Sequence, residues 1–487
     1  MPDAAFETYL LAALDAATDG GATYADVREV ITETRSLTTR GPTVEAVDRS
    51  ETIGFGVRVL ADGAWGFAAS FATEDPESAA AVAQQALAVA RAGATAIREP
   101  VELVPEPAHV DEWSTPFERD PFDVPMDEKL QLLLAASEPL DAYAGVRAGR
   151  ATMDLIKATT AFASSEGARI VQRVFHTGAG IEATAVSDDD VQSRSYPGSF
   201  RGHFGAGGYE LIERMDLAGN VERTAEEAVA LLAAPECPSG TYDLVLDGHQ
   251  VMLQMHESVG HPTELDRVLG MEAAYAGTSW VGIPDLGTVR YGSEHVNITS
   301  DGSAPGGLGT LRYDDEGVAV QRVDLLREGV LVGFQSSRET AAAMGADRSN
   351  GTMRADGWEN FPLIRMTNIN LLPGEGSFDD LLGGVDDGIY MATNKSWSID
   401  DKRKNFQFGC EIAWEIKGGK LGRIFKNPRY TGITQEFWGS CDGVAGPEEW
   451  RMWGTPNCGK EQPPQAMRVG HGTSPARFRG VSTGVDA

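Results

Sequence analysis

Residues 256–261 read His-Glu-Ser-Val-Gly-His and place a carboxylate between two imidazoles, at the end of an apolar run. This pattern is typical of zinc ligands beside a general base, but the usual spacing of the two histidines is four residues. Here the spacing is five, which at about 100° per residue is roughly 140° of helical rotation. A straight helix would not direct both rings at one ion. The segment therefore contains a π-bulge, or His261 lies beyond the helix end between Gly260 and Pro262.

The motif suits a catalytic zinc site, which commonly takes three nitrogen or sulfur ligands from the protein and one water molecule. His256 and His261 would supply two of these ligands. Glu257 would then accept a proton from the metal-bound water, whose pKa the metal lowers toward neutrality. The alternative is that two of the eight histidines fall this close by chance, as capping or surface residues.

The third ligand does not follow from spacing. Cys458 stands out, because it lies in a loop bounded by glycine and proline, with Lys460 nearby to favour the thiolate. A free thiol that only packs is the commoner role of a lone cysteine. Asp266 or Glu264 could orient a ligand histidine by accepting a hydrogen bond from the ring nitrogen that does not bind the metal. The other candidates for the third ligand are Glu264, Asp266, Asp285, Glu294, His295, Cys237, Cys410 and Cys441. Beyond this, His249, His295 and His471 are isolated in the sequence and are given no role.

Composition excludes several classes of protein. The 487-residue chain is too long for one core, so two domains are expected. A net charge of −31 argues against a nucleic-acid-binding surface and against docking on anionic lipid. No apolar run is long enough to span a bilayer, and no basic segment precedes an apolar one at the N-terminus, so we expect a cytoplasmic protein. The cysteines form no CxxC pair, which disfavours a disulfide scaffold.

The pattern of elements indicates an α+β protein. A chain break at 235–240 predicts an N-terminal α/β domain (1–236) and a β-rich C-terminal catalytic domain (237–487) that carries the motif helix. Asp62-Gly63 predicts a hairpin turn, and Asp75 followed by a proline predicts a helix start. The expected helices are 3–18, 75–92, 127–137 and 217–234; the expected strands are 23–32, 42–71, 145–186 and 242–246; and 99–125, with six prolines, is expected to be an extended connector.

Taken with its continuation through Asp266, the motif resembles the HExxxH signature of the TldD/PmbA family of metallopeptidases, and in particular the zinc-bearing TldD-type subunit. Pro262 departs from the family pattern, where a smaller and more flexible residue is expected. The likeness extends over nearly the whole chain. Its further landmarks are residues 56–60 (GVRVL), 64–68 (AWGFA), 313–317 (YDDEG), 336–340 (SSRET) and 365–368 (RMTN).

The resemblance implies that Zn²⁺ is held by His256, His261 and Cys458, with Glu257 as the general base. It also implies an N-terminal α/β domain followed by a mainly β domain. The family forms dimers that enclose a cavity for unfolded peptides, so the partner is expected to be a second copy or a homologous subunit that lacks the motif. Imidazole and thiolate ligands favour zinc over iron or cobalt.

We therefore expect a zinc-dependent metallopeptidase that cleaves unfolded or extended peptides, with Glu257 as base and a metal-bound water as nucleophile. An extended peptide could pair its backbone with a sheet edge. Two alternatives stay open. One is a catalytically silent, metal-stabilised peptide-binding subunit of a heteromeric complex, and the other is an amidohydrolase that acts on a small non-peptide amide.

Overall fold

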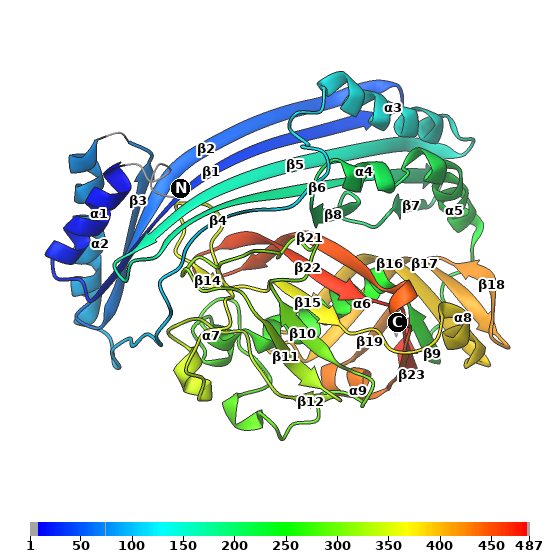
Figure 1. Ribbon diagram of the computed structural model, residues 1–487. Coiled ribbons are helices and arrows are strands. Elements are labelled where there is room, and N and C mark those ends of the chain that lie inside the picture. The colour runs from blue at the N-terminus through cyan, green and yellow to red at the C-terminus, as the bar shows by residue number, and fades with distance from the viewer. Residues whose placement is uncertain (1–7, 74, 485–487) are drawn as a thin grey trace.

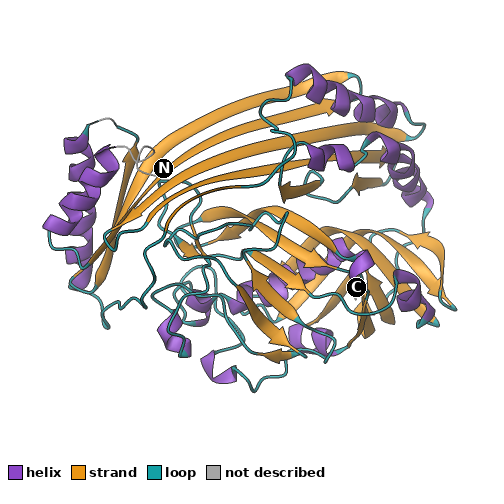
Figure 2. Ribbon diagram, viewed as in Figure 1, coloured by secondary structure: helices purple, strands orange, loops and turns teal. Residues whose placement is uncertain are grey.

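A long curved sheet from the first half of the chain arches over a body of shorter strands from the second half (Figure 1). The computed structural model describes residues 8–73 and 75–484. Helices gather at both ends of the arch, whereas the body is mainly strand and loop (Figure 2). The fold is therefore α+β, as predicted, with an α/β part followed by a mainly β part. The prediction that the domains divide at 236/237 stays a proposal.

The arch is an eight-stranded sheet whose central order is β3-β2-β1-β5-β6-β4, with β7 and β8 pairing to β6. β1 pairs antiparallel with both β2 and β5 along almost its whole length. The predicted turn at Asp62-Gly63 is confirmed: both residues have positive φ, 51° and 77°, and join β2 to β3. The strands are β1 (Tyr24–Arg40), β2 (Thr43–Ala61), β3 (Ala64–Phe71), β4 (Val110–Ser114), β5 (Val146–Ser164), β6 (Arg169–Val186), β7 (Val191–Tyr196) and β8 (His203–Ala206).

The helices of the arch begin where capping residues and acids predict them. The Asp75 side chain accepts hydrogen bonds from the Glu77 and Ser78 amides, so α2 starts at Pro76 as expected. The expected helix at 3–18 is described only from Thr8. None of the helices in the described ranges combines the length and apolar character needed to cross a bilayer. The helices are α1 (Thr8–Asp19), α2 (Pro76–Ala94), α3 (Met126–Ala142), α4 (Glu210–Arg214) and α5 (Val221–Ala233).

The connector at 99–125 differs from its prediction in one respect. Residues Val110–Ser114 form β4, which pairs parallel with β6 from Arg169 onward. Prolines flank this stretch without interrupting it, so the chain can add a short strand at the sheet edge. The remainder of the connector has little regular structure, as expected.

The body contains a six-stranded sheet of order β12-β11-β10-β15-β22-β21 and a seven-stranded sheet along β16-β9-β23-β19-β17-β18, where β20 pairs with β23. Strand β21 is thus the edge of its sheet. The strands are β9 (Gly240–Leu246), β10 (Ile298–Asp301), β11 (Arg322–Arg327), β12 (Val330–Leu331), β13 (Met353–Arg354), β14 (Leu363–Ile364), β15 (Asn368–Leu371), β16 (Asp387–Ile399), β17 (Asn405–Lys417), β18 (Lys420–Phe425), β19 (Arg429–Ile433), β20 (Cys441–Val444), β21 (Arg451–Lys460), β22 (Gln465–Thr473) and β23 (Ala476–Thr483). The helices are α6 (Gly248–Met255), α7 (Leu265–Val268), α8 (Phe378–Gly383) and α9 (Thr434–Gly439).

Ion pairs of two buried arginines join the arch to the body. Arg58 of β2 is almost fully buried and pairs with Asp26 at 2.7 Å, within the arch, and with Glu316 of the body at 3.0 Å. Arg338 of the body in turn pairs with Glu166 of the arch at 2.8 Å. Buried charges are costly unless they are paired, so these contacts fix the two parts against each other.

Candidate metal centre

The motif begins on α6, which the Asp247 side chain caps by accepting a hydrogen bond from the Gln250 amide. The backbone then widens into a π-helical turn from His256 to Gly260, and a 3₁₀ turn begins at His261. The two routes expected from the spacing, a π-bulge and a helix exit, thus occur in succession. A π turn takes up one extra residue, which brings the rings of His256 and His261 together with centroids 4.9 Å apart.

A close contact explains the glycine inside this turn. A Cβ at Gly260 would lie 2.2 Å from the sulfur of Met366. The π turn therefore packs tightly against the segment between β14 and β15, and a larger residue would push it away.

Cys458 reaches the histidines from β21, and a β-bulge sets its direction. Thr455 pairs with Val469 and Cys458 with Met467, so three steps along β21 match two along β22. As a result Thr455 and Cys458 are both buried on the body side, whereas Asn457 between them is exposed. The Cys458 sulfur lies 3.5 Å from Nε2 of His261.

The three residues proposed as metal ligands converge. Their ligand atoms lie within 4.8 Å of one another, and His256, His261 and Cys458 are all buried. In a tetrahedral zinc site with Zn–S of about 2.3 Å and Zn–N of about 2.0 Å, the sulfur and nitrogen are about 3.5 Å apart. The Sγ–Nε2 distance of 3.5 Å matches this value, so the donor set fits zinc. Among the described residues, none of the other candidate third ligands joins this group.

Each proposed ligand histidine makes a hydrogen bond through Nδ1, the ring nitrogen that does not face the metal site. Nδ1 of His256 lies 2.8 Å from Nε2 of His471, and Nδ1 of His261 lies 2.8 Å from Oε2 of Glu264. A proton on each Nδ1 leaves Nε2 as the lone-pair donor, the arrangement usual for metal-bound histidines. Glu264 was one of the two candidates for this role. His471 was not, since 215 residues of sequence separate it from His256.

Lys460 does not lie against the Cys458 thiol, contrary to the prediction. Its wholly buried side chain pairs with Asp266 at 2.8 Å, Glu272 at 3.2 Å and Glu264 at 3.3 Å. Asp266 therefore supports Lys460 and not a ligand histidine. Lys460 follows Cys458 by two residues on the same strand, so it ties the thiol strand to the residue that holds His261.

The cation that does act on the thiol is Arg365, whose Nη2 donates a hydrogen bond to the Cys458 carbonyl. Burial would raise the pKa of the Cys458 thiol, but His261 and Arg365 together lower it below its ordinary value. Burial also lowers the pKa of His256 and lowers that of His261 further. Neutral imidazoles and a thiolate are the protonation states that a metal requires.

Glu257 is buried beside these ligands and is contacted by Arg403, a residue without a role in the sequence-based prediction. Arg403 lies on the turn between β16 and β17 with φ of 61°, in the left-handed region. Its amide donates to the Asp400 carbonyl at 2.8 Å, and its Nη1 pairs with Oε2 of Glu257. The ion pair fixes the direction in which the Glu257 carboxylate points.

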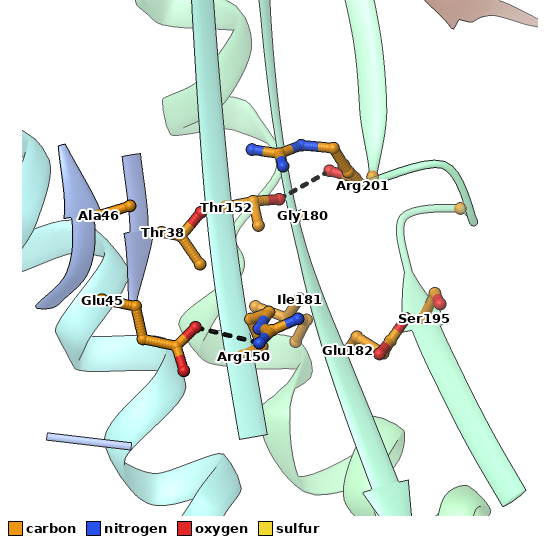
Figure 3. A pocket seen from close by; sticks show the side chains of 12 residues that line it. Thr38, Glu45, Ala46, Arg150, Thr152, Gly180, Ile181, Glu182, Ser195 and Arg201 are labelled. Atoms are coloured by element: carbon orange, nitrogen blue, oxygen red, sulfur yellow. Dashed lines mark hydrogen bonds and ion pairs between the residues drawn. The ribbon is translucent and has the colours of Figure 1, made fainter. Parts of the chain in front are cut away.

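Two cavities differ in their relation to these residues. One of about 630 Å³ is lined by Arg403 and by Gly459 and Lys460 at the end of β21, so it adjoins the metal centre. Another of about 340 Å³ lies under the arch between β1, β5 and β6 (Figure 3). Its arginines are already paired, Arg150 with Glu45 at 3.0 Å and Arg201 with Asp154 at 2.9 Å. None of the residues proposed from the motif lines this second cavity.

Comparison with family models finds three matches along the chain. Residues 25–90 match PmbA/TldA metallopeptidase domain 1, and residues 119–233 match the central domain of the same family. Residues 239–484 match the PmbA/TldA metallopeptidase C-terminal domain, so the last model covers more than half of the chain.

Similar proteins and solved structures agree with these matches. A metalloprotease of Methanothermobacter thermautotrophicus is 30% identical, over 95% of each chain. A zinc metalloprotease TldD homolog of Saccharolobus solfataricus is 28% identical over 40% of this chain and 42% of that one. A putative modulator of DNA gyrase from Thermotoga maritima has a TM-score of 0.78 at 18% identity, covering 98% of this chain and 100% of that one. TldE from Thermococcus kodakarensis has a TM-score of 0.71 at 16% identity, with the same coverage. These structures show the same fold.

Proposed function

The chain belongs to the PmbA/TldD metallopeptidase family, and from this premise we propose that it is a zinc-dependent peptidase that cleaves unfolded or extended peptides. The observation that carries the proposal is the convergence of two imidazoles and one thiol within 4.8 Å, next to a buried carboxylate. The relatives' names support the activity, since several are called metalloproteases and one a zinc metalloprotease.

In this proposal His256, His261 and Cys458 hold the metal. Zinc, when bound, supplies Lewis acidity that activates water and polarises a carbonyl group. Glu257 accepts the proton of the attacking water and then delivers it to the leaving amine of the cleaved peptide bond. Arg403 orients the Glu257 carboxylate, and the partners on Nδ1 keep the ligand rings in place.

The edge position of β21 supports binding of an extended backbone. A peptide that adds to this edge gains main-chain hydrogen bonds that depend little on its sequence. Such a peptide would run beside Cys458 and the cavity that Gly459 and Arg403 line. A compact folded protein presents no free strand of this kind, so we expect unfolded chains to be cleaved and folded ones spared.

The test is Glu257→Gln in zinc-loaded protein. Cleavage of a reduced and alkylated, unfolded protein should fall by about 100- to 10,000-fold, because the base is lost. The zinc content, measured by mass spectrometry, should stay as in the wild type. Glu375→Gln, at an exposed position, is the matched control. Full activity in the Glu257→Gln chain would refute the role of Glu257, and equal cleavage of folded and unfolded protein would refute the substrate class.

The two alternatives give different results in the same assays. A chain that binds zinc and unfolded peptide but cleaves nothing, alone or with a related subunit, would be a silent binding subunit. A chain that hydrolyses only small non-peptide amides would be an amidohydrolase. We also propose a cytoplasmic dimer, either of two copies or with a homologous subunit that lacks the motif. Native mass spectrometry of the chain purified from its own source would distinguish these assemblies.

A further inference from the structure

A further cavity lies between the arch and the body, and none of the proposed metal ligands lines it. It is a cavity of about 210 Å³ whose walls include the start of β1, the middle of β5 and β6, β13 and β22. Four groups that can carry positive charge line it: Arg28, His176, Arg354 and Arg468. This concentration is unusual in a chain whose net charge is −31.

Only one of the three arginines is fully partnered. Arg28 pairs with Asp315 at 2.7 Å and also donates to two backbone carbonyls. Arg354, only 5% exposed, uses Nη1 alone, which donates to the carbonyls of Met366 and Arg468. The Arg468 guanidinium has no hydrogen bond or ion pair with any described residue.

His176 completes the group. It is 5% exposed, and its Nε2 is buried with no partner among the described residues. His176, Arg354 and Arg468 line the same cavity. Burial lowers the pKa of His176, and the nearby charges of Arg468 and Arg354 lower it further. Burial likewise lowers the pKa of Arg354 to about 9 and lowers the pKa of Arg468.

The acids of the cavity do not neutralise these two arginines. Asp315 is taken up by Arg28, and Glu359 is exposed at the rim. Asp356 is the carboxylate that acts on Arg468, but no ion pair joins them, and one Asp356 oxygen accepts a hydrogen bond from the Ala466 amide. Arg354 is buried and Arg468 is partly buried. A guanidinium group that is shielded from water and has no paired anion is unfavourable, so an anion that enters this cavity is stabilised.

We propose that this cavity binds a carboxylate group of the peptide substrate, held by Arg354 and Arg468 with His176 beside them. The planar, forked guanidinium group matches a carboxylate in two parallel hydrogen bonds. The nearby Asp356 and Glu359 disfavour a dianion such as phosphate, because they add repulsion for each extra negative charge. The inference rests on the proposed peptidase function, which supplies the peptide.

The position of the cavity relates it to the metal centre. Met467, which lines the cavity, pairs with Cys458 across β21 and β22. Asp356 lines both this cavity and the one that Arg403 borders beside Glu257. A peptide that follows this path places its carboxylate between Arg354 and Arg468. The substrate class is therefore peptides with a free C-terminus, or with an aspartate or glutamate side chain, at a fixed distance from the cleaved bond.

The test uses synthetic peptides based on one sequence without aspartate or glutamate: the free C-terminal acid, its C-terminal amide, and a series of the amide in which one internal residue at a time is replaced by glutamate. Binding is measured by calorimetry to the full-length, zinc-loaded Glu257→Gln chain, which separates affinity from cleavage. We expect the acid, or one glutamate peptide, to bind about tenfold more tightly than the plain amide, as for a charged hydrogen bond. Preference for the acid identifies the C-terminus as the source, and preference for one glutamate position identifies a side chain.

Substitution of Arg468 completes the test. In the Glu257→Gln background, Arg468→Gln should remove the preference, and Arg468→Lys, which keeps the charge, should retain part of it. Arg322→Gln, an exposed arginine on β11, should retain all of it. The Arg468 backbone carbonyl that Arg354 uses is unchanged in these variants.

The outcomes separate this inference from the proposed function. Equal binding of all the peptides, or a preference that survives Arg468→Gln, would overturn the carboxylate site, even if the wild-type chain cleaves every peptide. A preference that depends on Arg468 would support the site, even in a chain that cleaves none of the peptides. The absence of cleavage by the wild-type chain would refute the peptidase function and leave the carboxylate site intact.

Discussion

The arch and the metal centre are built in opposite ways. In the arch, β1 pairs residue for residue from Tyr24 to Thr38 with β2, its neighbour along the chain, and the apolar pattern of the strands favours this register. In the metal centre, Cys458 and His471 come from some 200 residues beyond the motif, and buried polar contacts hold them there. Regular hairpins thus make a scaffold from local information, whereas the centre depends on a few long-range polar contacts.

This difference predicts where substitutions have large effects. A buried polar group that loses its partner costs more than a surface contact, because neither water nor another side chain replaces the lost bond. The centre holds a lysine among three carboxylates, all buried, whereas many ion pairs of the arch are partly exposed. Changes in the centre should therefore affect both folding and metal binding, and changes in the arch should affect folding alone.

The largest effect is expected for Lys460→Met. This change leaves three buried carboxylates without their common cation, and removal of one partner from a buried ion pair costs about 3–5 kcal/mol of unfolding free energy. The measurement is chemical denaturation with EDTA present, so that metal binding does not contribute. Lys420→Met, at an exposed position on β18, is the control. A Lys460→Met chain as stable as the wild type would show that the network does not hold the centre together.

An intermediate effect is expected for His471→Phe. The ring volume is roughly kept, but the acceptor for Nδ1 of His256 is lost, so zinc affinity should fall by about 10- to 100-fold. Competition against a chelator of known affinity measures the change. The exposed His295 provides the control, His295→Phe. If affinity is unchanged while stability drops, His471 is a packing residue and not a positioning residue.

The smallest effect is expected in the arch, for Ser137→Ala. The Ser137 hydroxyl donates to the Gly41 carbonyl at 2.7 Å and anchors α3 to the turn between β1 and β2. Loss of one such hydrogen bond costs about 1 kcal/mol. Zinc content should not change, since distant sites act independently. Ser398→Ala, an exposed serine without a described hydrogen bond, should alter neither property. A loss of zinc in Ser137→Ala would contradict the separation of arch and centre.

The sequence predicts most of the scaffold and the core of the candidate site. The Asp62-Gly63 turn and the Asp75 cap are local signals, and the structure confirms both. The five-residue histidine spacing led to a π-bulge or a helix exit, and both are present. In each case neighbours along the chain carry the information.

The parts that were missed depend on contacts across the fold. Arg403 reaches Glu257 from a hairpin turn 146 residues away, and no local pattern marks it. The proximity of Lys460 to Cys458 in sequence suggested a contact, and the two residues do share a buried face of β21, because the strand is regular beyond the bulge. The long Lys460 side chain nevertheless pairs with carboxylates from the segment after the motif, and the sequence does not show that these carboxylates lie there.

The β-bulge in β21 also determines on which face of the strand the Cys458 thiol lies. The extra residue between Thr455 and Cys458 inverts the alternation of the strand beyond it. A chain shortened by one residue there would keep the two histidines and the cysteine, yet the sulfur would turn away from the imidazoles. Insertions and deletions in this short stretch are therefore as informative about activity in related chains as the ligands themselves.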